Sequence, residues 1–300
     1  EALSFLHAKD RILQPLMRVG ERGESKWKTI TWEEALDYIS DHLNKIKNKL
    51  GAESISLYRG QASDWGAPWH YAQRFMNLLG SPNMCTPSNL CLLASVIGKR
   101  VTYGGVLQPD WNDKTKSIII WGANPSETNE HGVGGKKIID SIENGAKLIV
   151  IDPFETLIAK KADLWLQIKP GTDCALALAF INVIINENLY DESFIKKWTV
   201  GFDQLKSHIL DYSPEDVSPI VGIPAEKIKK AARMFACNKP GVIYDRNGLD
   251  QYYNAVQTNR AISILLSILG QIDVSGGMAF LTSVKSQFIN FREKLSRSVK

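Results

Sequence analysis

The sequence predicts an α/β fold with a doubly wound, mostly parallel Rossmann-like sheet, helices on both faces, and part of a second α/β domain. Short uninterrupted apolar runs, such as 117–121 (SIIIW) and 146–151 (AKLIVI), are typical of strands that are buried on both faces. Helical patterns alternate with these runs, and this alternation implies parallel strands joined by right-handed crossovers. The runs end at glycine, proline or aspartate residues, which favour turns.

The part of the chain before this alternation shows patterns of only a few helices and strands. Residues up to 30 are polar and irregular. Thr31 and Glu34 then form a capping-box pattern, and an apolar stripe at positions 36, 39, 43, 46 and 50 predicts a helix that ends at Gly51. Three further elements follow: a strand near 55–57, a helix over 68–79, and a helix from Thr86 or Ser88 to about residue 101.

The alternating part of the sequence contains the strands of the predicted sheet and the helices that flank it. We expect strands at 117–121, 146–151, 164–168 and 241–244. Helices are predicted over 134–143, after Asp173, over 224–236 and over 254–269. The segment 283–300 changes to a charged pattern, and we expect it to leave this domain.

Composition excludes several classes of protein. Hydrophobic residues make up 44% of the 300 residues and charged residues 23%, which excludes a wholly disordered chain. The net charge of +4 is too mild to indicate a nucleic-acid partner. The most apolar runs, 175–185 and 261–269, are shorter than the ~20 residues that span a bilayer, so no direct membrane span is predicted. The sequence begins at Glu1, as expected of a processed form or a piece of a longer chain.

Small, polar and acidic residues follow the predicted strands, whose carboxyl ends meet at one edge of a parallel sheet. They are Gly122, Asn124, Asp152, Gly171, Asp173 and Gly248, and Trp121 is the last residue of the first of these strands. Gly122 and Gly171 permit close backbone approach to a ligand, and Trp121 can stack on one. Asp152 suits ribose hydroxyls, and Asp173 can accept two N–H bonds from a purine such as guanine. The hypothesis is a ligand that contains a nucleotide; the alternative is that each Asp only caps a helix and each Gly only makes a turn.

Two glycine-rich patterns do not indicate ordinary nucleotide sites. The run 132–135 (GVGG) lacks the G-x-G-x-x-G spacing of a dinucleotide fingerprint. The run 135–137 (GKK) lacks the Ser or Thr and the upstream Gly of a P-loop. An ordinary NAD or ATP site is therefore not supported.

Cys91 is the cysteine with the most informative position. It lies near the predicted N-terminus of the helix that ends near 101, where free N–H groups and the helix dipole favour a thiolate. A thiolate is a soft ligand for a transition metal and a competent nucleophile. From the residues alone, a small buried hydrophobe is the more common role for such a cysteine. Cys85 and Cys91 are six positions apart, which does not fit a zinc knuckle.

Many short motifs, in order, resemble the molybdopterin oxidoreductases of the dimethyl sulfoxide reductase family, which are bis(molybdopterin guanine dinucleotide) enzymes. The resemblance covers about residues 11–280 and no single motif decides it. The motifs include 15–23 (PLMRVGERG), 31–36 (TWEEAL), 80–83 (GSPN), 121–125 (WGANP), 151–153 (IDP), 170–173 (PGTD), 248–251 (GLDQ) and 272–277 (IDVSGG).

The resemblance implies a role for each candidate residue. Cys91 would be the protein ligand of molybdenum or tungsten, and the metal would also bind four sulfurs of two pterin dithiolenes. Asp152 would bind a ribose and Asp173 a guanine. The other residues implied to contact the cofactors are Trp121, Gly122, Asn124, Gly171, Gly248, Gln251 and Asn254.

The chain also departs from the family pattern. The cysteines of a [4Fe-4S] cluster would precede Glu1, and a C-terminal cofactor-binding domain would follow residue 300. The resemblance thus implies a first lobe of a discontinuous domain at 1–86, a central cofactor-binding domain at 87–286, and a return segment at 287–300. Phe154 stands where an Arg is frequent, so one phosphate or base contact differs. Leu92 stands where similar formate dehydrogenases carry His, which disfavours formate as the substrate.

The implied function is that of a fragment of a molybdenum or tungsten oxidoreductase. Such an enzyme would transfer an oxygen atom, sulfur or hydride to or from a small-molecule substrate, and pass two electrons to an iron–sulfur cluster and then to an iron–sulfur subunit, in the cytoplasm or periplasm of a prokaryote. One alternative is a non-catalytic structural subunit of a redox complex with the same fold. An ordinary nucleotide-binding α/β domain is the other.

Overall fold

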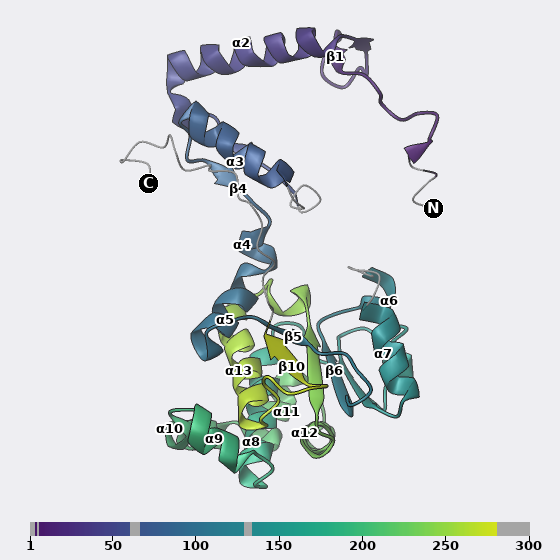
Figure 1. Cartoon of the computed structure of the whole chain (residues 1–300), viewed down its shortest axis with the longest axis vertical. Helices are drawn as coiled ribbons and strands as arrows, with labels where there is room; N and C mark the ends of the chain where they lie inside the picture. The colour runs from purple at the N-terminus through teal and green to yellow at the C-terminus, as the bar shows by residue number, and fades with distance from the viewer. Residues whose placement is uncertain (1–3, 5, 61–66, 129–133, 281–300) are drawn as a thin grey trace. The chain divides into compact units, whose positions relative to one another are not determined.

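The computed structural model describes residues 4, 6–60, 67–128 and 134–280 (Figure 1). These residues fall into two compact units, one that runs up to Pro87 and one that begins at Ser88. The return segment expected at 287–300 lies outside the described residues.

The first unit contains an antiparallel pair, a long helix and a small parallel pair. Its elements are β1 (Leu16–Arg18), β2 (Trp27–Thr29), α2 (Trp32–Leu50), η1 (Ala52–Ser54), β3 (Leu57–Tyr58), α3 (Ala67–Leu79) and β4 (Met84–Cys85). The capping box is confirmed: the Glu34 backbone N–H donates to Thr31 Oγ1 at 3.1 Å, and the Thr31 N–H donates to Glu34 Oε2 at 2.7 Å. Gly51 ends α2 with a φ of 87°.

The second unit is built on a parallel sheet. Among the described residues, β8 (Leu164–Leu166), β7 (Lys147–Ile151), β6 (Ser117–Trp121) and β9 (Gly241–Asp245) hydrogen-bond in that order, with every pair parallel. In this order the chain moves outward from β6 to β7 and β8 and then returns to β9 on the other side of β6. The gap between the ends of β6 and β9 is therefore the topological switch point, where such sheets bind ligands.

Helices flank this sheet and confirm the predicted fold class. In Figure 1, α7 lies on the opposite side of the sheet from α8 and α13. The helices of this unit are α4 (Ser88–Cys91), α5 (Leu93–Tyr103), α6 (Pro125–Thr128), α7 (Gly134–Glu143), α8 (Asp173–Asn186), α9 (Glu192–Trp198), α10 (Phe202–His208), α11 (Pro214–Val221), α12 (Ala225–Cys237) and α13 (Ala255–Ile268). Within the described ranges, no helix has the length and apolar character that crossing a membrane requires.

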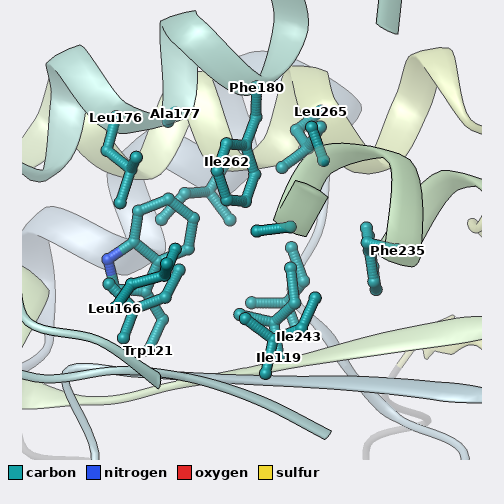
Figure 2. Close-up of a cluster of buried hydrophobic side chains, with 14 of the residues drawn as sticks. Ile119, Trp121, Leu166, Leu176, Ala177, Phe180, Phe235, Ile243, Ile262 and Leu265 are labelled. Atoms are coloured by element: carbon teal, nitrogen blue, oxygen red, sulfur yellow. The ribbon is translucent and has the colours of Figure 1, made fainter. Parts of the chain in front are cut away.

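The core lies between the sheet and the helices α8, α12 and α13 (Figure 2). Ile119 of β6 and Ile243 of β9 are at most 1% exposed, and Phe180 of α8 and Phe235 of α12 pack on the same cluster. Full burial of both faces explains why these strands are apolar throughout and show no alternation. The carboxyl ends of the strands are consequently held on a rigid support.

Several elements differ from the sequence prediction, among them α11 and the pair β1–β2, which lies in a stretch that was expected to be irregular. Helices α9 and α10 are seven residues each, too short to show a clear apolar period, and were not predicted. An antiparallel pair, β5 (Leu107–Pro109) with β10 (Met278–Phe280), was not predicted either. The helix expected through residue 101 is interrupted at Leu92, which has φ −128° and ψ −22°.

The cause of this interruption is a bond from outside the helix. In a continuous helix the Ser95 N–H would donate to the Cys91 carbonyl, four residues earlier. Here it donates to Asp250 Oδ1 at 2.8 Å instead. Cys91 therefore ends α4 and does not lie within the first turn of a longer helix.

Candidate functional site

The loops after β6 and β9 meet at the switch point through two glycines. The Gly248 N–H donates to the Gly122 carbonyl at 3.0 Å, and Gly122 has a φ of 57°. A Cβ at Gly248 would lie 2.6 Å from Gly122 Cα, closer than real Cβ atoms approach a neighbour. Only glycine fits this contact, so the close approach of the two backbones explains why positions 122 and 248 are both glycine.

A pocket of about 240 Å³ opens beside this contact. It brings together five of the residues predicted from the strand ends: Gly122, Asn124, Asp152, Asp173 and Gly248. The volume is below the range of about 300–1,000 Å³ for complete ligand sites, so the pocket suits part of a larger ligand. Phe154 and Tyr252 also line it. Tyr252 was missed by the sequence analysis because it lies in a loop with no strand-end pattern.

Asp173 is buried and is held by Trp121. The Trp121 indole Nε1–H donates to Asp173 Oδ1 at 2.8 Å. Burial raises the pKa of the Asp173 carboxyl, and the indole N–H opposes that rise. Asp173 is the first residue of α8 and Thr172 is its N-cap residue, so the predicted capping role of Asp173 is wrong.

Trp121 differs from the expectation of a stacking residue. Its side chain is fully buried and packs on Phe180, with ring centroids 5.9 Å apart (Figure 2). A ring in this position is not open to a ligand. Its link to the pocket is the hydrogen bond to Asp173.

Asp152 both stabilises a turn and lines the pocket. Its Oδ1 accepts the backbone N–H of Phe154 at 2.8 Å, and its carbonyl accepts the Trp165 indole N–H at 3.0 Å. Burial raises the pKa of this carboxyl, and the Phe154 N–H opposes the rise. The ligand interpretation and the capping interpretation of Asp152 are therefore compatible.

The remaining predicted contact residues lie around this pocket or outside it. Gly171 has a φ of 83°, and a Cβ there would lie 3.4 Å from the Tyr252 ring. Gln251 and Asn254 are exposed and do not line the pocket. Asn254 is the N-cap residue of α13, without a capping bond from its side chain.

Cys91 lies next to the loop after β9. Its thiol is half-buried and donates to Asn247 Oδ1, with 3.6 Å between the sulfur and the oxygen. Asn247 directly precedes Gly248, which lines the pocket. The described part of the chain contains no group of three or more His, Cys, Asp or Glu side chains placed to hold a metal. Cys91 is therefore a single soft donor beside the pocket.

A buried polar network ties α5 to the same loop. Lys99 Nζ lies 2.7 Å from Asp245 Oδ2, and the two side chains are 6% and 8% exposed. Asp250 Oδ1 accepts the Ser95 N–H and also the Asn259 side-chain N–H at 3.4 Å. Burial raises the pKa of Asp250 to about 6. No short motif signals such a network, because its members are about 150 residues apart in sequence.

Removal of one charge of the Lys99–Asp245 pair should be far more costly than removal of both. Lys99→Met leaves a buried, uncompensated carboxylate, and we expect it to lower the free energy of unfolding by about 3 kcal/mol. Lys99→Met with Asp245→Val removes both charges and should recover most of that loss. Urea denaturation followed by circular dichroism measures both. A double variant as unstable as Lys99→Met would contradict the assignment of a buried ion pair.

Asp250→Asn should change the pH dependence of stability. Because the folded-state pKa of Asp250 lies above the unfolded value, the ionised carboxylate costs stability at pH 8, and this cost disappears as the pH falls through about 6 toward 4. Asn keeps an oxygen for the Ser95 N–H and carries no charge. The variant should therefore be more stable than the wild type at pH 8, with the difference shrinking by pH 4.5 in urea denaturation. Lys99 and Asp245 face the same group and are unchanged in this comparison. A difference that stays constant with pH would exclude this effect.

The sequence and the structure both match known molybdopterin proteins. Residues 11–294 match the model of the family described as molybdopterin oxidoreductase. The chain is 40% identical over 267 residues to acetylene hydratase of Syntrophotalea acetylenica, a match that covers 87% of this chain and 36% of the relative. It is 35% identical to dimethyl sulfoxide reductase DmsA of Haemophilus influenzae, over 89% of this chain and 37% of the relative.

A solved structure shares the fold. The structure of acetylene hydratase from Pelobacter acetylenicus matches with a TM-score of 0.81 and 37% sequence identity, over 93% of this chain and 38% of that one. The chain therefore spans a little over a third of the length of these relatives. A family model that matches nearly the whole chain, and relatives of this identity, show that the chain belongs to the molybdopterin oxidoreductase family.

Proposed function

We propose that this chain is the cofactor-binding central part of a molybdenum or tungsten oxidoreductase with a bis(molybdopterin guanine dinucleotide) centre. The proposal rests on one observation: three features occur together at the carboxyl ends of the strands. They are a half-buried thiol, a contact between two glycines, and a pocket with two buried carboxylates. Family membership supports a pterin cofactor with molybdenum or tungsten.

The residues at this edge fit such a cofactor. The thiolate of Cys91 is a soft donor, which suits a transition metal that also binds the dithiolene sulfurs of a pterin. Asp173 has a carboxylate geometry suited to two N–H groups of guanine, and Asp152 is suited to ribose hydroxyls. The glycines at 122 and 248 let the two loops that line the pocket approach each other closely, because a Cβ on either glycine would meet the backbone of the other. The pocket volume of about 240 Å³ suits one nucleoside of the larger cofactor.

The roles of the chain's own residues follow from this placement. When bound, the metal centre would supply two-electron redox chemistry for transfer of an oxygen atom, sulfur or hydride. Cys91 would hold the metal, and Asp152 and Asp173 would orient the nucleoside end of one cofactor. Trp121 would keep Asp173 in place through its indole N–H. The protein thus supplies orientation and electrostatic field to the cofactor.

Electron transfer and partners belong to the same proposal. We infer that the complete protein carries a [4Fe-4S] cluster and transfers electrons to an iron–sulfur subunit. The names of two relatives support the existence of partner subunits: a thiosulfate reductase molybdopterin-containing subunit of Salmonella typhimurium and an F420-dependent formate dehydrogenase subunit alpha of Methanocaldococcus jannaschii. Both names describe a subunit of a larger assembly.

The metal content of the full-length protein tests the enzyme proposal. Expressed anaerobically, the wild type should contain about one molybdenum or tungsten atom per chain by plasma mass spectrometry. Cys91→Ala should alter the electron paramagnetic resonance spectrum of the metal because it removes a sulfur ligand. Cys237→Ala, at an exposed cysteine, is the matched control and should leave the spectrum unchanged. Wild-type protein without either metal would favour the non-catalytic structural subunit.

Nucleotide selectivity tests the role of Asp173. In thermal-shift assays of this chain, GDP at about ten times its dissociation constant should raise the Tm by about 3 °C. ATP and NAD should not, because the pocket lacks their fingerprints and the carboxylate selects the guanine N–H groups. Asp173→Asn keeps the oxygen that Trp121 needs and should lose the response. An equal response to adenine nucleotides would favour the ordinary nucleotide-binding domain.

A further inference from the structure

Asn247 is the residue whose side chain meets the sulfur of Cys91. The Cys91 thiol donates to Asn247 Oδ1 at 3.6 Å, across 156 positions of sequence. Asn247 begins the short helix η5 (Asn247–Leu249), which starts the loop after β9. Neither the sequence patterns nor the proposed cofactor contacts assign a role to it.

Two anchors hold the loop on either side of Asn247. Before it, Asp245 is joined to Lys99 at 2.7 Å, and after it, Asp250 is joined to the Ser95 N–H at 2.8 Å. Ser95 and Lys99 are on α5, four and eight residues after Cys91. All four anchor residues are less than 10% exposed.

These contacts form a closed frame. It runs from Cys91 at the end of α4 to Ser95 and Lys99 on α5 and crosses to Asp250 and Asp245. It then returns through Asn247 to Cys91. Breaking a buried ion pair or a buried charge-assisted hydrogen bond costs much free energy, because it leaves a buried polar or charged group without a partner. The frame therefore restricts how far Asn247 can move from the sulfur.

The side-chain amide of Asn247 suits both states of the sulfur. A free thiol donates its S–H to the amide oxygen, as observed. A metal-bound sulfur has no proton and can only accept. A half-turn of the amide about its terminal torsion places an N–H donor in the position of the oxygen, so Asn can serve both states without movement of the backbone.

We propose that Asn247 is a positioning residue that donates an N–H hydrogen bond to the metal-bound sulfur of Cys91, held in place by the Lys99–Asp245 and Asp250–Ser95 contacts. The inference rests on the proposed function, because it requires Cys91 to bind the metal. A donor to a ligating thiolate withdraws electron density from the sulfur and stabilises the more electron-rich, reduced state of the metal.

The test compares metal reduction potentials in the full-length holoenzyme, measured by redox titration with electron paramagnetic resonance. Asn247→Asp has the same shape but no N–H donor, and it places a carboxylate beside the sulfur. Asn247→Leu removes the hydrogen bond without adding charge. We expect both variants to keep their metal and to shift the potential to more negative values, with the larger shift in Asn247→Asp.

The control is Asn144→Leu, at an exposed asparagine that precedes β7 at the opposite edge of the sheet, and it should leave the potential unchanged. Wild-type potentials in both Asn247 variants, with metal content unchanged, would overturn this inference and leave the proposed function intact. Wild-type protein without molybdenum or tungsten would overturn the proposed function, and this inference with it. The two failures are therefore distinguishable.

Discussion

The contact of two glycine backbones at the switch point is the constraint on which the rest of the site depends. Gly248 donates its N–H to the Gly122 carbonyl, and neither residue has room for a Cβ on the side that faces the other. The loops after β6 and β9 are thereby joined at the place where the strand order reverses. Asp152 and Asp173 line the pocket beside this contact, and Asn247, the residue before Gly248, accepts the hydrogen bond of the Cys91 thiol. A side chain at either glycine would separate the two halves of the site.

Several carboxyl groups are buried near the carboxyl ends of the strands, and each of them has a specific partner. Asp245 has Lys99, Asp173 has the Trp121 indole, and Asp250 has the Ser95 N–H. Burial nevertheless raises the pKa of Asp152, Asp173 and Asp250, so these partners offset the desolvation only in part. A chain selected only for stability would place apolar residues here. Perturbed carboxyl groups gathered at a strand edge are the pattern expected where a site has been favoured over stability.

The sequence was informative where local chemistry decides structure and uninformative where distant residues do. The apolar runs predicted the strands because burial on both faces leaves a local signature, and the Thr31–Glu34 pattern predicted the capping box. The strand-end rule placed Gly122, Asp152 and Asp173 in one pocket. It could not show that Trp121 turns into the core, because a strand-end ring can face either way. Nor could it show the break at Leu92, which depends on a carboxylate 155 positions away from Ser95.

That break decides which part of the fold presents the cysteine. In an unbroken helix from 86 to 101, the Ser95 N–H would bind the Cys91 carbonyl, and the cysteine would be set by the direction of that helix alone. Because Asp250 takes the Ser95 N–H, the position of Cys91 is set by the loop after β9, and thus by the sheet. The thiol, Asn247 and the pocket residues all belong to the unit that begins at Ser88. The first unit supplies none of the predicted site residues. The proposed metal ligand Cys91 and the residues that line the pocket therefore belong to one unit, and the same sheet and the same loop after β9 hold both of them.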